Sequence, residues 1–122
     1  MPKTRVVLYR TRDGRVPILD WLDGLTEKAR AKCVVRVERL ADLGHELRRP
    51  EADYLRDGVH ELRAKHGGIN YRMLYFFHGR DVVVVSHGLL KQRSDVPEGD
   101  IELALWRKRA FEEDPSAHTH EE

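Results

Sequence analysis

The stretch LRAKHGGINYRMLYFF, residues Leu62–Phe77, decides the fold because it holds two strand-like runs separated by Gly67-Gly68. A glycine pair of this kind suits a two-residue hairpin turn, which needs positive φ at both positions. In that register His66 pairs with Ile69. The second run has large apolar side chains on both of its alternating faces, which predicts a central strand that is mostly buried.

Two arginines flank this turn. With a two-residue turn Arg63 lies directly opposite Arg72 on the same face of the sheet, whereas a three-residue loop would place Arg63 opposite Tyr71. Like charges opposite each other are unfavourable, so the first register requires nearby carboxylates or a bound anion. Glu61 is a candidate carboxylate two residues from Arg63, and Asp81 is a second candidate partner for Arg72. An anion site and a purely structural ion pair are therefore both open.

Outward from the hairpin, the pattern predicts a β-meander. We expect strands at Val59–Lys65, Ile69–Phe77 and Val82–His87, the last two joined by a turn around Gly79. The polar segment before them, residues 45–58, contains Pro50 and is expected to be a loop.

The N-terminal half predicts one strand and two helices. The run Arg5–Thr11 is β-branched and aromatic, which is typical of a strand. A short helix begins near Pro17 and ends at Gly24, and a longer one extends from a cap at Thr26 to Gly44. The apolar stripe of the longer helix, at spacings of three and four, consists of Ala29, Cys33, Val37, Leu40 and Leu43.

A last helix is expected over residues 97–113, with Ile101, Leu105 and Trp106 facing inward. The order of one strand, two helices, three strands and one helix predicts an α+β fold with a mainly antiparallel sheet. We expect the two N-terminal helices to pack on one face of the sheet. The other face would be partly open and is the natural place for a site.

Length and composition fit one soluble domain. The chain has 122 residues, of which 35% are charged, and it contains no apolar run long enough to span a bilayer and no secretory signal pattern. Cys33 is the only cysteine, so no internal disulfide forms. These features predict a cytoplasmic protein with no membrane association.

Charge is distributed unevenly along the chain. Residues 1–111, which we assign to a single domain, hold all 22 Lys and Arg but only 16 of the 21 acids. Residues 112–122 hold the other five acids, and we expect them to be a disordered acidic tail. A basic domain suits a phosphate-bearing partner, although a mixed-charge soluble surface is the simpler interpretation. We also considered that the tail screens the basic face.

Four cations are expected to gather at one end of the sheet. If the second and third strands of the meander pair, then Arg72, His87, Lys91 and Arg93 converge there. Such a group suits a phosphodiester, because arginine grips phosphate bidentately and lysine or histidine moves protons. Taken singly, a capped strand end for His87 and a solvated loop for Lys91 and Arg93 are the simpler interpretations.

The segment GVHELRAKHGGINYRMLYFFHGRDVVVVSHGLLKQRSDVP and the later DIELALWR resemble the RelE superfamily. The likeness extends from about Val6 to Arg109 and is closest to the HigB-like, phage-derived branch of toxins from type II toxin–antitoxin modules. It implies a RelE-like α+β fold and metal-independent cleavage of messenger RNA, usually on the ribosome, with the RNA 2′-hydroxyl as nucleophile. It also implies a cognate antitoxin, which we expect to be a small helix-turn-helix protein, and no cofactor.

The resemblance also suggests roles for individual residues. Arg63 resembles the arginine that stabilises the phosphate, and Lys91 and Arg93 fall in the basic loop after the last long strand. His87 is a candidate for proton transfer, so the catalytic set comprises these four residues. The expected RNA-binding residues are Lys65, His66, Tyr71 and Arg72.

One stretch departs from the usual pattern of this branch. The basic loop is LLKQRSDVP, with Gln92 in place of a lysine and Leu89 where an aromatic residue is common. Loss of cleavage is therefore one alternative, leaving a regulatory or decayed toxin. Another is a ParE-like inhibitor of DNA gyrase, because the same fold serves both activities. The spacing of His118 and His120 permits adventitious metal binding, but no cluster of ligand-type residues in the sequence of residues 1–111 suggests a metal site.

Overall fold

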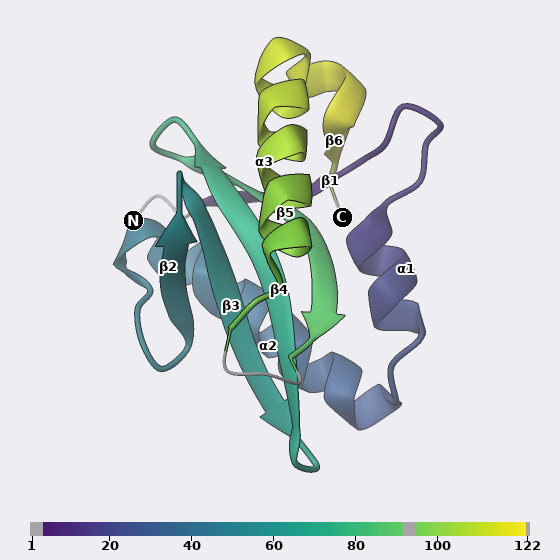
Figure 1. Cartoon of the computed structure of the whole chain (residues 1–122), viewed down its shortest axis with the longest axis vertical. Helices are drawn as coiled ribbons and strands as arrows, with labels where there is room; N and C mark the ends of the chain where they lie inside the picture. The colour runs from purple at the N-terminus through teal and green to yellow at the C-terminus, as the bar shows by residue number, and fades with distance from the viewer. Residues whose placement is uncertain (1–3, 92–94, 122) are drawn as a thin grey trace.

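The computed structural model describes residues 4–91 and 95–121. A six-stranded sheet with strand order β2-β3-β4-β5-β1-β6 forms the centre of the molecule (Figure 1). The helices and strands are β1 (Arg5–Tyr9), α1 (Pro17–Asp23), α2 (Glu27–Leu43), β2 (Ala52–Arg56), β3 (Val59–His66), β4 (Ile69–His78), β5 (Val82–Leu90), α3 (Glu98–Glu113) and β6 (Thr119–His120), with short 3-10 turns at Gly44–Glu46 and Pro115–His118.

The predicted hairpin register is confirmed. Gly67 and Gly68 have φ of +59° and +78°, and His66 pairs with Ile69. Strands β2 to β5 form an antiparallel meander, while β1 lies parallel to β5 and carries the short antiparallel β6 at its outer edge. The predicted α+β fold with a mainly antiparallel sheet is therefore confirmed.

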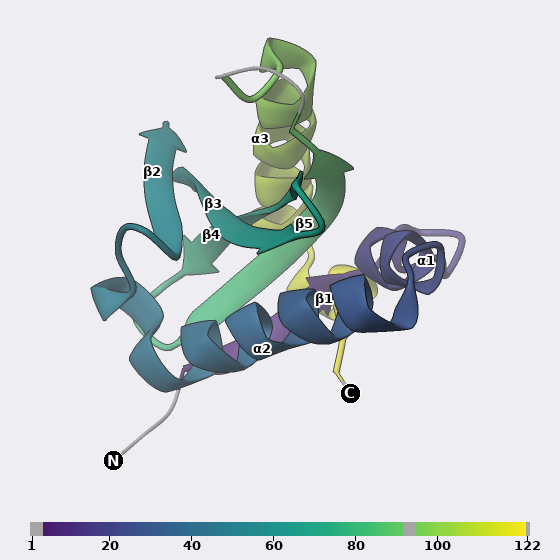
Figure 2. The ribbon, with the colours of Figure 1, turned by 90° about the horizontal axis from the view of Figure 1, so that it is seen from below.

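The helices cover both faces of this sheet (Figures 1 and 2). Helices α1 and α2 lie against one face, and α3 lies against the other. The hydroxyl of Thr26 accepts a hydrogen bond from the Ala29 N–H, and Gly44 ends α2 with a φ of +53°, as its sequence predicts. In α2 the predicted stripe packs inward, with Ala29, Cys33 and Leu40 buried.

The core has two layers, one on each side of the sheet. Under α1 and α2, side chains such as Met73, Tyr75 and Val85 pack against the helices. On the other face, Phe76 packs with Phe111. Trp106 does not join this layer, because it is 59% exposed; Ala104 and Ile101 face the sheet instead. Among the described residues, no helix combines the length and apolar character needed to cross a membrane.

The segment expected to be a loop contains a strand. Ala52–Arg56 forms β2 and pairs with the first half of β3, so the prediction for this part of residues 45–58 was wrong. The reason is that β2 is an edge strand in which only Ala52 is buried. Asp53 lies opposite Glu61 and Tyr54 opposite His60, so the strand shows little hydrophobic alternation.

The acidic tail is ordered as far as Glu121, contrary to expectation. Helix α3 continues to Glu113, and β6 then pairs with β1. The ring of His118 is buried, stacks on Tyr9 and hydrogen-bonds through Nδ1 to the Arg10 carbonyl at 2.8 Å. These contacts supply the burial that the polar composition of the tail did not suggest.

Candidate functional site

The predicted site residues lie on two faces of the sheet. Arg63 and Arg72 are cross-strand partners, and with His87 and Lys91 they alternate onto the α3 face. Tyr71 points to the α2 face, where it is buried edge-on against Trp21. These described cations therefore share one face of the sheet, and Tyr71 lies on the other.

The remaining predicted residues are near the turn or outside the described chain. Lys65 and His66 lie at the end of β3, beside the turn, and border a groove against α2. Arg93 lies outside the described residues, as does Gln92.

The counter-ion of the two opposed arginines is a carboxylate of this chain. Glu61 is 2% exposed and lies between them, with Oε1 at 2.9 Å from Arg72 Nε and Oε2 at 3.2 Å from Arg63 Nη2. Asp53 on β2 adds a contact of 3.1 Å to Arg63 Nη2. Burial lowers the pKa of Arg72, and the Glu61 charge opposes this effect. Of the two possibilities raised by the sequence, the structural ion pair is therefore present.

An open groove of about 460 Å³ runs over these charges between β2, β3 and the start of α3. The described charged residues that line it are four cations and four carboxylates: Arg49, Arg56, Arg63, Lys91, Asp53, Glu61, Asp95 and Glu98. Among the described lining residues, positive and negative charges are therefore equal in number.

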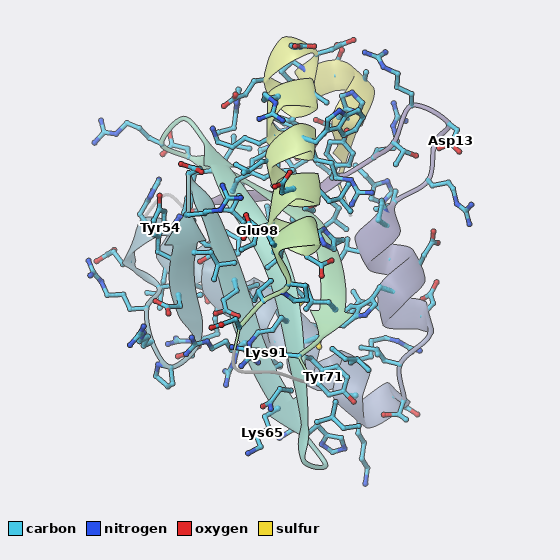
Figure 3. All side chains as sticks on the ribbon, viewed as in Figure 1. Asp13, Tyr54, Lys65, Tyr71, Lys91 and Glu98 are labelled. Carbon is cyan, nitrogen blue, oxygen red and sulfur yellow. The ribbon has the colours of Figure 1, made fainter. Side chains whose placement is uncertain are left out.

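The three arginines of this groove are all paired. Arg49 contacts Asp53 at 2.8 Å, Arg56 contacts Glu98, and Arg63 is held as described above. The pairing with Arg49 is the main cause that lowers the pKa of Asp53. These side chains therefore form a fixed rim (Figure 3 labels Tyr54 and Glu98 on it).

Lys91 differs from these arginines. Its backbone N–H donates to the Asn70 carbonyl at 2.8 Å, which fixes its position just beyond β5 (Figure 3). Its ammonium makes no hydrogen bond or ion pair with any residue in ranges 4–91 and 95–121. Lys91 is thus a half-buried cation that is available to a ligand of the groove.

His87 lies outside this groove, in a buried polar cluster that joins β5 to α3. Its Nδ1 is 2.8 Å from Ser86 Oγ and its Nε2 is 3.0 Å from Asp100 Oδ1, and Arg107 donates to the Ser86 carbonyl at 3.1 Å. A register shift in β5 beside Leu74 brings Ser86 and His87 into this position. Burial is the main cause that lowers the pKa of His87.

The order Ser, His, Asp in this cluster is that of a nucleophilic triad. Ser86, however, is completely buried, so a substrate has no access to its hydroxyl. The cluster is suited to holding α3 in place rather than to acting on a ligand. The thiol of Cys33 is likewise unsuited to act as a nucleophile, since burial raises its pKa to about 11.

Asp53 and Asp100 are among the site residues that the sequence did not predict. Asp53 was assigned to a loop, although the placement of a carboxylate opposite Glu61 follows once β2 is recognised. Asp100 was assigned only to the beginning of the last helix. Its contact with His87 depends on the packing of α3 on β5. No local signal in the sequence indicates that contact.

The molecule is thus a small α+β protein with a four-stranded meander, a helix pair on one face and a charge-paired groove beside the single helix on the other. The family described as "Phage derived protein Gp49-like (DUF891)" matches residues 20–109. The chain belongs to this Gp49-like family of phage-derived proteins. A comparison with curated proteins gave no match.

Proposed function

We propose that this chain is the toxin of a type II toxin–antitoxin module and that it cleaves messenger RNA on the translating ribosome without a metal. The observation that carries the proposal is the Lys91 ammonium, which borders an open groove together with Arg63 and has no carboxylate partner in the described part of the chain. Folding does not require an unpaired cation there. The RelE-like arrangement of the fold and membership of the Gp49-like family support the same assignment.

In the proposed reaction the scissile phosphate lies between Lys91 and Arg63. The 2′-oxygen of the preceding ribose forms a bond to phosphorus, and the bond from phosphorus to the 5′-oxygen breaks. The products are a 2′,3′-cyclic phosphate and a 5′-hydroxyl. Arg63 keeps donors beyond those engaged by Asp53 and Glu61, so it can stabilise the developing negative charge.

Two proton transfers complete the reaction. Asp95 lines the same groove, is exposed and has no ion-pair partner within residues 4–91 and 95–121, so we assign it as the base that accepts the 2′-hydroxyl proton. Lys91 supplies the proton for the departing 5′-oxygen. We assign neither transfer to His87, because its two ring nitrogens contact Ser86 and Asp100 inside the protein.

A second candidate function is supported by the pairing of the described arginines of the groove with carboxylates. With Arg63 and Arg72 held by Glu61, the chain could retain the fold and the partner binding of a toxin without cleaving RNA. Such a protein would act only in regulation. The departure of the basic loop from the usual pattern, at Gln92 and Leu89, agrees with this candidate.

The test is induced expression of the wild type, Lys91→Ala and Arg80→Ala, followed by growth measurement and primer extension on a translated message. Arg80 lies in the exposed β4–β5 turn, away from the groove, and serves as the matched control. We expect growth arrest and new cuts with the wild type and with Arg80→Ala, and neither with Lys91→Ala. Arrest without cuts would favour a gyrase-type target, and unchanged growth would favour the non-cleaving protein.

The proposal includes a partner. A ribonuclease that acts on the messages of its own cell must be restrained, so we expect a cognate antitoxin, a small helix-turn-helix protein, in the cytoplasm. Co-expression of the protein encoded by the neighbouring gene should restore growth and should co-purify with this chain.

A further inference from the structure

A second groove, on the opposite face of the sheet, is lined by several cations and by no described carboxylate. It lies between α2 and the end of the β3–β4 hairpin and has a volume of about 590 Å³. Its cations are Lys28, Lys32, Arg36 and Lys65, with His66 beside them, and none of the described residues that line it is an Asp or Glu. The described residues of the groove beside α3, by contrast, carry equal numbers of both charges.

The arrangement of these cations is unfavourable for the folded protein alone. Lys28, Lys32 and Arg36 follow one another at four-residue spacing on α2, about 6 Å apart, where like charges destabilise a helix. Arg36 is compensated, because it contacts Glu51 at 3.4 Å and donates to the Arg63 carbonyl at 2.8 Å. Lys28, Lys32 and Lys65 have no side-chain hydrogen bond or ion pair with the described residues.

The floor of the groove is apolar. Ala31, Val35 and Ala64 line it, and Val35 is 49% exposed although it lies on a helix that is buried on its other side. No Phe, Tyr or Trp is among the described lining residues. Single-stranded RNA is usually held by stacking on such rings, whereas an apolar strip between rows of cations suits a peptide that carries both apolar and acidic side chains.

We propose that this groove binds an acidic, amphipathic segment of a partner protein. The carboxylates would pair with Lys28, Lys32 and Lys65, and the apolar side chains would cover Val35. The chain's own tail does not fill this role, because β6 lies at the β1 edge of the sheet and Glu121 pairs with Arg5. The binding site is independent of RNA cleavage; only the identification of the partner with the antitoxin depends on the proposed function.

The experiment measures fluorescence anisotropy of a labelled peptide of alternating Glu and Leu blocks, with a Gln-for-Glu peptide and a single-stranded oligouridine RNA as comparison probes. The test variant is Lys28→Glu/Lys32→Glu. The matched control is Arg80→Glu/Arg109→Glu, which changes the net charge equally at exposed positions outside the groove. Lys91→Ala is included to separate this site from the proposed catalytic groove.

We expect the test variant to bind the acidic peptide at least about tenfold more weakly, and the control variant and Lys91→Ala to bind within about twofold of the wild type. The Gln peptide should bind weakly to every form of the protein. Equal losses in the two charge-reversal variants would refute the proposal, as would absence of peptide binding to the wild type. Displacement of the peptide by oligouridine from the wild type and from Lys91→Ala alike would assign the groove to RNA instead.

Discussion

Replacing Glu61 by Gln is expected to destabilise the fold by about 3–5 kcal/mol, because it leaves a buried guanidinium without a counter-charge. Glu61 is 2% exposed and Arg72 is 8% exposed. Within the described chain, Arg72 has no ion pair with another carboxylate. Arg63 is affected less, since it keeps its contact with Asp53.

The magnitude follows from the geometry of the pair. At the 2.9 Å that separates Glu61 Oε1 from Arg72 Nε, the Coulomb attraction is about 6 kcal/mol at an effective dielectric constant of about 20. The neutral amide of Gln recovers part of this as a hydrogen-bond acceptor. A domain of this size has a total stability of about 5–15 kcal/mol, so the loss should shift the urea midpoint by about 2 M.

The assay is urea unfolding followed by the fluorescence of Trp21. The control is Asp53→Asn. We expect it to lower the free energy of unfolding by about 1 kcal/mol, because its partner Arg49 is largely exposed. The double variant Glu61→Gln/Arg72→Met should recover most of the lost stability, since it removes the buried charge as well. If Glu61→Gln lowers the free energy of unfolding by no more than Asp53→Asn does, the buried pair does not stabilise the fold as expected.

Three further predictions concern packing, pH and reactivity. A side chain at Gly88 would collide with the ring of Trp21, so Gly88→Ala should cost about 1–3 kcal/mol and lower the melting temperature. Burial is the main cause that lowers the pKa of His60 from 6.5 in the folded protein. As the pH falls, His60 is therefore protonated at a higher pH in the unfolded chain than in the folded chain. Stability should therefore be full above pH 6.5 and decline below it, and His60→Phe should reduce this decline in denaturant titrations at several pH values. Since burial raises the pKa of Cys33 to about 11, roughly one thiol in a thousand is ionised at pH 8, and iodoacetamide should label it only after unfolding.

The hairpin could be predicted because its signal is local. Gly67-Gly68 determines the turn type, and the turn determines that Arg63 lies opposite Arg72. The caps of α2 at Thr26 and Gly44 were predictable for the same reason. The features that were missed depend on contacts between residues far apart in the chain. Strand β2, for example, forms by pairing with β3, which its own polar sequence does not indicate.

The site was only partly predictable. The sequence showed that the arginine pair needs an anion and named Glu61 as one candidate, but burial of that carboxylate between both arginines became evident only from the packing. Convergence of His87 with Lys91 was a reasonable inference from strand pairing. His87 lies on the same face of the sheet as Lys91, but its two ring nitrogens contact Ser86 and Asp100 in a buried cluster.

The sequence shows one part of the basic groove on the α2 face, namely the four-residue spacing of Lys28 and Lys32. Their relation to Lys65 was not, because only the tertiary structure brings the end of β3 beside α2 (Figure 2). Charge spacing within one helix can be recognised locally, whereas a groove between two elements requires the fold.

The most direct test of the proposed function uses a message with a single 2′-deoxynucleotide at a mapped cut site, translated by purified ribosomes in the presence of this chain. The 2′-hydroxyl is the nucleophile in the proposed reaction, so the all-ribose message should be cut to a product with a 5′-hydroxyl. The deoxy-substituted message should remain intact at that site, and Lys91→Ala should cut neither. Equal cutting of both messages by the wild type would contradict the account.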